Sequence, residues 1–202
     1  MTMVSSAFKP AVNGVIEPIA RAASKAGITP NAVTVVGTIG TTAAAVYFYP
    51  RGDLFVGTLL ICLFALSDLF DGAIARFSEA GASAWGGFLD STCDRITDAA
   101  ILGALSVYCI IEDNRLAPLA VASLVTGFLV SYIRAKAESY GIACTVGIAE
   151  RTERIIISLT AIGFHGLGVP YILAIGLWIL FALSAITALQ RFWVVRQGLL
   201  AQ

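Results

Sequence analysis

Charged side chains are scarce in this chain of 202 residues. Lys, Arg, Asp and Glu together make up 13% of it, against roughly 25% in a typical soluble domain. Hydrophobic residues make up 58%, and the mean hydropathy is +0.86. This composition excludes an ordinary soluble domain and indicates a protein of the lipid bilayer.

Residue types that build other kinds of site are also few. There is one histidine, His165, and the four cysteines contain no CxxC pair. We therefore expect no zinc site of His and Cys, and we interpret the cysteines as small buried side chains. The formal net charge is zero, which argues against a nucleic-acid partner.

The apolar segments predict an all-α integral membrane protein with six transmembrane helices. A span needs about 20 apolar residues, or fewer where its ends reach water. The expected spans are 32–49, 54 into the segment at Asp68, 90–111, 116–138, 154–165 and 169–193. Before them, charged and polar residues recur at four-residue spacing over about 5–25, which predicts an amphipathic helix lying in the membrane interface. We expect one domain over 1–202, with the six-helix bundle at about 30–197.

Basic residues are distributed unequally between the two ends of these spans. The loops at 50–53, 112–115 and 165–168 contain only Arg51 and Arg115 of the 13 Lys and Arg residues. The other basic residues fall at the opposite ends. By the positive-inside rule, both chain termini and the acidic motif described next are expected on the cytoplasmic side of the membrane.

Four aspartates lie at the ends of two apolar segments. Asp68 and Asp71 are three residues apart, and Asp90 and Asp94 are four residues apart. On helices, each pair shares one face. Four carboxylates that converge near a membrane repel one another, and two divalent cations would supply the compensating charge. The spacing therefore predicts a metal site.

The residues between these aspartates favour phosphate chemistry. Gly72 permits close approach of the backbone to a pyrophosphate, and Arg76 can pair with a phosphate in bidentate fashion. The whole pattern is D-x2-D-G-x2-A-R, nine further residues, then G-x3-D-x3-D. It resembles the motif of the CDP-alcohol phosphotransferase family at every fixed position, and the resemblance extends over most of the chain. Within that family, the chain looks most like the bacterial phosphatidylinositol phosphate synthases.

The resemblance implies roles for these residues. Asp68, Asp71, Asp90 and Asp94 would bind two metal ions, normally Mg²⁺ with Mn²⁺ as a substitute, and Asp94 would also be the base for the acceptor hydroxyl. The donor would be CDP-diacylglycerol, with CMP leaving. The residues implied at the nucleotide are Asn31, Ala32, Val33, Thr34, Gly72, Arg76 and Ser83. The family also implies that the protein forms a homodimer and that membrane lipids surround it.

A basic cluster near the fourth and fifth spans suits an anionic acceptor. Its expected members are Ser131, Arg134, Lys136, Arg151, Arg154 and Arg191. These cations also fit simple binding of lipid phosphates at the cytoplasmic surface. Asp98 continues the spacing of Asp90 and Asp94 by one more turn, and we expect it to pair with an arginine rather than to bind metal.

Three functions remain open on the sequence. The first is transfer of a phosphatidyl group to inositol phosphate, and the second is the same chemistry with glycerol 3-phosphate as acceptor. Serine fits the basic cluster less well. The third, a cation transporter, requires acids deep in the bilayer, whereas these aspartates lie at the ends of the spans beside Gly72 and Arg76.

Overall fold

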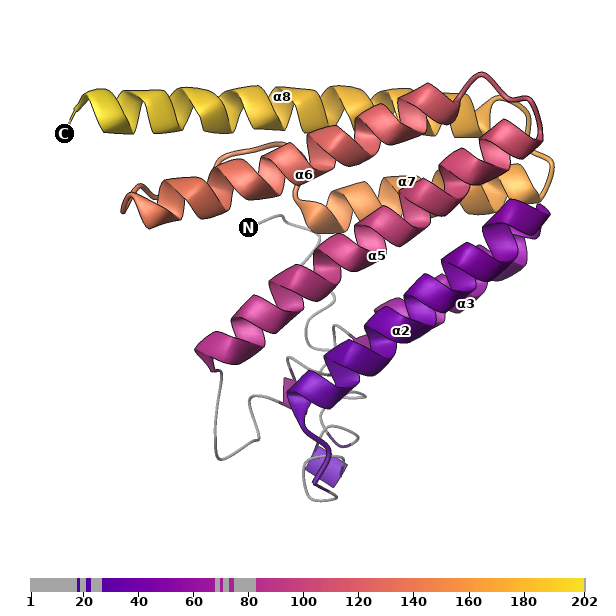
Figure 1. Cartoon of the computed structure of the whole chain (residues 1–202), viewed down its shortest axis with the longest axis horizontal. Helices are drawn as coiled ribbons and strands as arrows, with labels where there is room; N and C mark the ends of the chain where they lie inside the picture. Colours follow the sequence, from indigo (N-terminus) through magenta and orange to yellow (C-terminus); the bar gives the residue numbers. More distant parts are fainter. Residues whose placement is uncertain are drawn as a thin grey trace. The chain divides into compact units, whose positions relative to one another are not determined.

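The computed structural model describes residues 18, 21–22, 27–67, 70, 73–74 and 83–201. This part of the chain is helical and contains no strand. Its helices are α2 (Pro30–Phe48), α3 (Leu54–Ala65), α5 (Ala84–Ile111), α6 (Ala117–Ser139), α7 (Arg151–Gly166) and α8 (Ile172–Leu200), with a short 3-10 helix, η1 (Tyr49–Arg51), after α2 (Figure 1). The all-α prediction is confirmed for the described residues.

Helix boundaries follow local signals in the sequence. Pro30 is the first residue of α2, where its missing N–H costs nothing. The hydroxyl of Thr29 accepts a hydrogen bond from the Ala32 N–H at 3.2 Å, so Thr29 caps the helix. After η1, Gly52 adopts a φ of +84°, a left-handed conformation that turns the chain into α3.

Three of the described helices are long and apolar enough to cross a membrane. They are α2 together with η1, α6 and α8. α3 is a shorter apolar helix, α7 has only 16 residues, and α5 is long but carries several charged residues in its first half. The expected interfacial helix at 5–25 lies outside the described residues, apart from Pro18, Arg21 and Ala22.

The chain divides into two compact units, of which the first contains residues 1–43 and 61–97. Within it, two glycines of α2 allow close approach of the end of α3 and the residues that follow. A Cβ added at Gly37 would collide with Ser67, and one at Gly40 would collide with the ring of Phe64. Small residues of this kind let membrane helices pack backbone to backbone.

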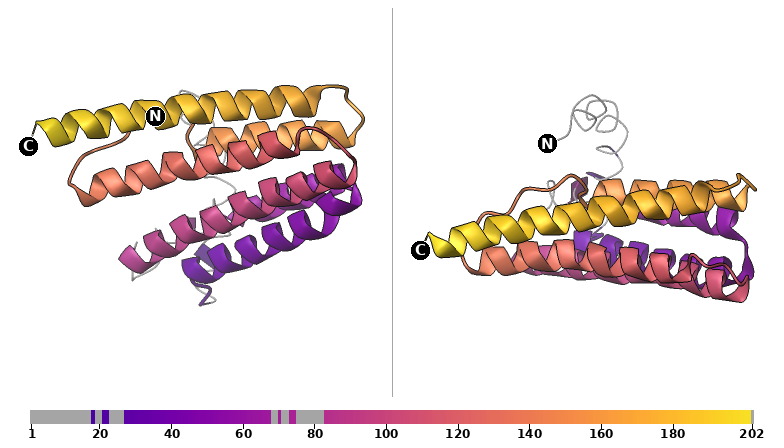
Figure 2. Two further views of the ribbon diagram at one scale, coloured as in Figure 1. Left: turned by 45° about the horizontal axis from the view of Figure 1, so that its top comes forward. Right: turned by 90° about the horizontal axis from the view of Figure 1, so that it is seen from above.

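The second unit contains residues 44–60 and 98–202. Within it, α8 packs along both α6 and α7 (Figure 2). Leu173, Leu177 and Leu180 form the buried side of α8, at the spacing of one helix face. A Cβ at Gly176 would collide with Ala161, so α7 and α8 touch closely here.

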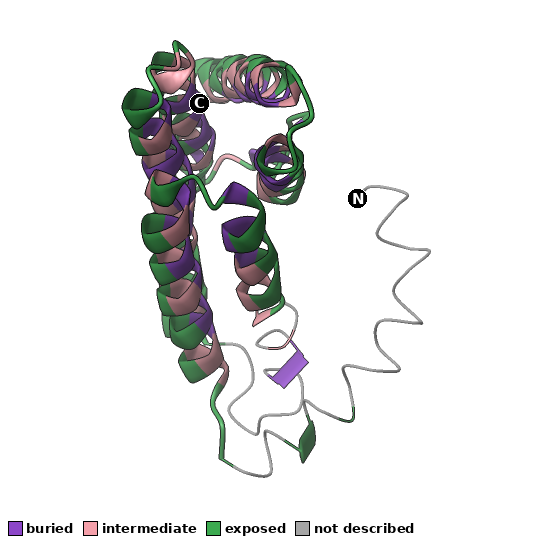
Figure 3. Ribbon diagram, turned by 90° about the vertical axis from the view of Figure 1, so that its right-hand side faces the viewer, coloured by how far each residue is buried: buried purple, intermediate pink, exposed green. Residues whose placement is uncertain are grey.

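Large apolar side chains remain exposed on the helices. On α8, Trp178 is 59% exposed, Leu189 69% and Phe192 61%. Figure 3 shows helices that are buried along one side and exposed along another. Because the outer sides are apolar rather than charged, they suit lipid and not water.

Candidate active site

The first turns of α5 present two aspartates of the acidic motif. Asp90 is exposed, and Asp94, one turn later, is half-buried. An oxygen of the Asp94 carboxylate lies 3.8 Å from Nη2 of Arg95. The Thr97 hydroxyl donates to the Asp94 backbone carbonyl at 3.0 Å, so its proton is not directed at the carboxylate. The Asp94 side chain is 18% exposed, so it is less accessible to solvent than Asp90.

This donor set has the right chemistry for a divalent cation. Two carboxylates one turn apart on a helix supply the oxygen ligands that Mg²⁺ and Mn²⁺ prefer. The partners expected from the sequence, Asp68 and Asp71, lie outside the described residues, as do Gly72 and Arg76. Among the residues that are described, no group of three potential ligands converges.

Residues expected at the nucleotide meet at the N-terminus of α5. The Ser83 hydroxyl accepts a hydrogen bond from the Gly86 N–H at 3.0 Å. A Cβ added at Gly86 would lie 3.2 Å from both the Asn31 amide oxygen and the Ser83 hydroxyl. Asn31 and Ser83, far apart in sequence, thus approach one backbone segment. Thr34 is buried and donates to the Pro30 carbonyl at 3.1 Å.

An apolar groove of about 500 Å³ adjoins these residues in the same unit. Ala32 and Val33 line it together with Phe64 and Leu66, and all other lining residues except Gly37 and Ser67 are also apolar. Two of the residues expected at the nucleotide therefore face an apolar groove. A groove of this composition suits hydrocarbon rather than a charged group.

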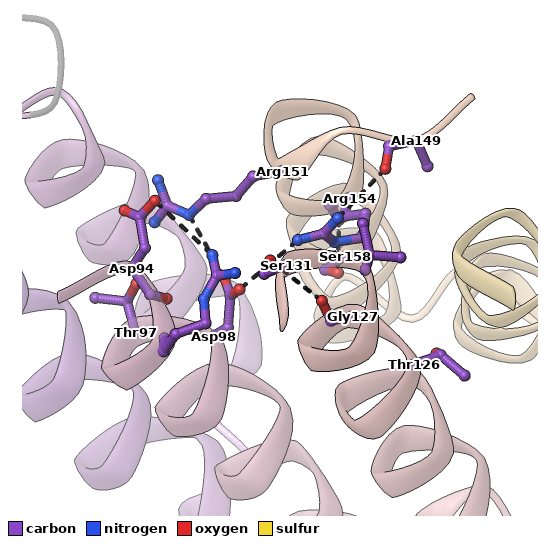
Figure 4. Close-up of polar contacts among 12 residues, drawn as sticks. Asp94, Thr97, Asp98, Thr126, Gly127, Ser131, Ala149, Arg151, Arg154 and Ser158 are labelled. Carbon is purple, nitrogen blue, oxygen red and sulfur yellow. Dashed lines mark hydrogen bonds and ion pairs between the residues drawn. The ribbon is translucent and has the colours of Figure 1, made fainter. Parts of the chain in front are cut away.

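In the second unit, one aspartate joins two arginines of α7. A carboxylate oxygen of Asp98 lies 3.7 Å from Nε of Arg151, and the other lies 4.0 Å from Nη2 of Arg154 (Figure 4). The Arg154 side chain is only 7% exposed, and its Nη1 donates to the Ala149 carbonyl at 3.3 Å. The expectation that Asp98 pairs with an arginine is confirmed.

A small cavity of about 20 Å³ lies beside this pair. It is lined by Asp98 and Arg154, by Ser123 and Ser158, and by apolar residues of α5 to α8. A space of this size accommodates one water molecule. The buried end of the cluster is thus nearly closed, which strengthens the attraction between its charges.

Three further residues of the predicted basic cluster make contacts along α6 and at its end. Ser131 donates to the Gly127 carbonyl at 3.4 Å. The exposed Arg134 donates from Nε to Glu138 at 3.0 Å, and the Lys136 ammonium lies 4.8 Å from the centre of the Tyr140 ring. These contacts do not connect Arg134 or Lys136 to the pair on α7.

Arg191, like Arg154, is buried and bonded to the backbone, with 3% of the residue exposed. Its Nε donates to the Val146 carbonyl at 2.9 Å and its Nη1 to the Val130 carbonyl at 2.8 Å. It therefore holds the segment between α6 and α7. Thr187, one turn earlier on α8, contacts the same segment and was not singled out from the sequence. A polar residue within an otherwise apolar span was the available signal.

Comparison with known proteins identifies the family. The CDP-alcohol phosphatidyltransferase family matches residues 27–195. The phosphatidylinositol phosphate synthase of Streptomyces avermitilis is 42% identical over 192 residues, which are 91% of this chain and 78% of that protein. The protein of the same name from Mycobacterium tuberculosis H37Rv is 41% identical over 184 residues, with 88% and 84% covered.

Solved structures agree with these relatives. The Mycobacterium tuberculosis phosphatidylinositol phosphate synthase with CDP-DAG bound matches with a TM-score of 0.83 at 38% identity, covering 90% of this chain and 93% of that one. Its complex with manganese and citrate gives 0.82 at 40% identity, with 89% and 88% covered. Similarity to these relatives in both sequence and fold therefore extends over nearly the whole chain. It belongs to the CDP-alcohol phosphatidyltransferase family and is a phosphatidyltransferase.

Proposed function

We propose that this protein transfers the phosphatidyl group of CDP-diacylglycerol to a hydroxyl of inositol phosphate, giving phosphatidylinositol phosphate and CMP. The observation that carries the choice of acceptor is the pair of arginines on α7, Arg151 and the buried Arg154, held by Asp98. A guanidinium held in a fixed direction is suited to bind a phosphate. The relatives named phosphatidylinositol phosphate synthase support the same acceptor.

The donor side of the proposal rests on the first unit. The acidic residues Asp68, Asp71, Asp90 and Asp94 hold two Mg²⁺ ions, for which Mn²⁺ can substitute. When bound, such ions neutralise charge on the phosphate oxygens. The residues proposed at the cytidine diphosphate are Asn31, Ala32, Val33, Thr34, Gly72, Arg76 and Ser83. The apolar groove beside Ala32 and Val33 accommodates the hydrocarbon next to this head group.

The proposed chemistry needs one proton transfer. Asp94 accepts the proton of the acceptor hydroxyl. The hydroxyl oxygen then forms a bond to the phosphorus that carries the diacylglycerol, and the bond from that phosphorus to CMP breaks. Asp94 suits this role because its carboxylate is half-buried yet accessible.

The acceptor phosphate is bound by the basic cluster. We assign this role to Ser131, Arg134, Lys136, Arg151, Arg154 and Arg191. Arg154 contributes most, because it is buried and already oriented by Asp98 and Ala149. Arg134 and Lys136 contribute less, since each is exposed and already has a neighbouring partner, Glu138 for Arg134 and Tyr140 for Lys136.

We further propose six membrane spans in a single domain, preceded by the interfacial helix. Three of these spans are the helices long enough to cross a membrane, which are α2 with η1, α6 and α8. The other three proposed spans are α3, α5 and α7. The active site then faces the cytoplasm of a bacterial cell, where most basic residues lie. A homodimer is proposed on the family resemblance.

A panel of acceptors tests the proposed function. The purified protein in detergent is given radiolabelled CDP-diacylglycerol and Mg²⁺ with inositol phosphate, inositol, glycerol 3-phosphate or serine. We expect labelled lipid mainly with inositol phosphate. Faster transfer to glycerol 3-phosphate would replace the acceptor but keep the reaction, whereas no transfer to any of these four alcohols would contradict the proposed acceptor.

A further inference from the structure

The backbone of the segment between α6 and α7 is bonded to side chains of α8. Thr187 of α8 is fully buried, and its hydroxyl oxygen accepts two hydrogen bonds, from the Ile148 N–H at 3.2 Å and the Ala149 N–H at 3.1 Å. Both N–H groups lie outside any regular helix. One side-chain oxygen therefore satisfies two consecutive backbone donors.

Two neighbouring contacts fix the same segment. Arg191, one helical turn beyond Thr187, donates from Nε to the Val146 carbonyl at 2.9 Å. Gly147 has a φ of +140°, and a Cβ added to it would collide with Cγ2 of Thr187. Four consecutive residues, 146–149, are thus placed against two turns of α8.

Ala149 connects Thr187 to Arg154 of the basic cluster. Its N–H is bonded to Thr187, and its carbonyl accepts a hydrogen bond from Nη1 of Arg154 at 3.3 Å (Figure 4). The other terminal nitrogen of Arg154 faces Asp98 at 4.0 Å. A shift of Ala149 would therefore change the direction of the Arg154 guanidinium.

We infer that Thr187 is a positioning residue for the acceptor-phosphate site: through Ala149, it orients the guanidinium of Arg154. This inference rests on the proposed role of Arg154 in binding the acceptor. It assigns to Thr187 an effect on acceptor binding although Thr187 does not itself touch the acceptor.

The physical reason is the cost of leaving the buried N–H of Ala149 without an acceptor. Valine has nearly the shape of threonine but no oxygen, so Thr187→Val removes the acceptor of both N–H groups, of which that of Ile148, an exposed residue, can turn to water. Ala149 is fully buried, and its N–H cannot turn to water without moving the loop. An unsatisfied buried donor typically costs about 1–3 kcal/mol, a roughly five- to 150-fold effect on an equilibrium.

Four variants of the full chain in detergent test this inference. Thr187→Val removes the oxygen, and Thr187→Ser keeps it while removing the methyl group. Ser184→Ala is the matched control, because Ser184 is fully buried on the same helix and its hydroxyl has no hydrogen-bond partner among the described residues. Arg154→Gln reports whether the acceptor site itself is correctly assigned.

We expect Thr187→Val to raise the KM for inositol phosphate by about tenfold or more, with the KM for CDP-diacylglycerol within about twofold of the parent. Thr187→Ser should keep the parent's KM for the acceptor, and Ser184→Ala should leave both constants unchanged. Hydrogen exchange of the peptide covering 142–150 should speed up in Thr187→Val only. Should that variant not fold, Thr187→Ala removes the same oxygen without the branched side chain.

Three results would overturn the inference in different ways. If Arg154→Gln raises the acceptor KM and folded Thr187→Val does not, Thr187 has no positioning role while the proposed function stands. If Arg154→Gln leaves the acceptor KM unchanged, the acceptor assignment fails and the inference fails with it. Equal weakening of both substrates by Thr187→Val would indicate a general structural role instead.

Discussion

The acidic motif and the basic cluster carry opposite charges and depend on the sequence differently. The aspartates of α5 are placed by local spacing, whereas the basic cluster is placed by contacts between residues far apart in the chain. Asp90 and Asp94 lie four residues apart on one helix, so helical geometry alone places them on one face. The basic cluster depends on contacts between distant residues. Arg191 reaches carbonyls 45 and 61 residues earlier in the chain, and Arg154 of α7 meets Asp98 of α5.

This difference shows what each kind of site needs in order to form. The placement of Asp90 and Asp94 on one face needs only α5, and the neighbouring Arg95 compensates part of the Asp94 charge. Buried guanidinium groups need partners at all times, since an uncompensated buried charge is costly. Arg154 and Arg191 are accordingly bonded to backbone carbonyls of the loop between α6 and α7. The acceptor site is therefore more sensitive to tertiary packing.

The largest expected effect tests the acidic side. Asp94→Asn removes the proposed base while keeping the size of the side chain. We expect the rate of phosphatidyl transfer to fall by about 10²–10⁴-fold, with donor binding largely kept. Transfer of radiolabel measures the first and binding of CDP-diacylglycerol in detergent measures the second.

The matched control for Asp94→Asn is Asp113→Asn. Asp113 is exposed, and its φ of +50° is a conformation that asparagine also adopts readily. This change should leave transfer unaffected. A folded Asp94→Asn protein with the parent's rate would remove Asp94 from the mechanism.

Most helices were predictable because their limits are set locally. The expected spans at 116–138 and 90–111 correspond to α6 (Ala117–Ser139) and α5 (Ala84–Ile111). The last span was expected to end near residue 193 but extends to Leu200 as part of α8. Its final turns are amphipathic rather than purely apolar, so hydropathy alone placed the end too early.

The basic cluster was predicted from the charge of its residues, and charge does not determine the direction in which a side chain points. Arg134 and Arg154 look equivalent in the sequence, yet one is exposed beside Glu138 and the other is buried beside Asp98. The role of Thr187 depends on two N–H groups 38 and 39 residues earlier in the chain. No local pattern contains that information, because it arises when α8 packs against the loop.

A smaller expected effect tests the difference between these two arginines. Arg154→Gln should raise the KM for inositol phosphate by about tenfold or more, because a desolvated, charge-assisted contact is lost. Arg134→Gln should raise it by no more than about threefold, since an exposed cation is screened by water. Steady-state kinetics with both substrates varied measures this difference. The ranking would be wrong if Arg134→Gln were the more damaging change.

Ser83 offers the finest test on the donor side. Its hydroxyl accepts from the Gly86 N–H, as expected for a residue that caps α5. The same position lies near Asn31, where the nucleotide is proposed. If Ser83 only caps α5, a negative charge at this position should leave donor binding unchanged. If Ser83 also lies at the donor, the same charge should weaken donor binding.

The smallest expected effect comes from comparing Ser83→Ala with Ser83→Asp. Ser83→Ala removes the cap, which typically costs about 1 kcal/mol, and should raise the KM for CDP-diacylglycerol roughly fivefold. Aspartate is as good a cap as serine, so Ser83→Asp would restore the parent's KM if Ser83 only caps the helix. If Ser83 also lies at the pyrophosphate, the added negative charge repels the donor, and we expect a higher donor KM than for Ser83→Ala.

Measuring the donor KM at two ionic strengths separates the cases further, because repulsion by an exposed charge weakens as salt increases. A donor KM for Ser83→Asp equal to the parent's would reduce Ser83 to a helix cap and withdraw it from the donor site.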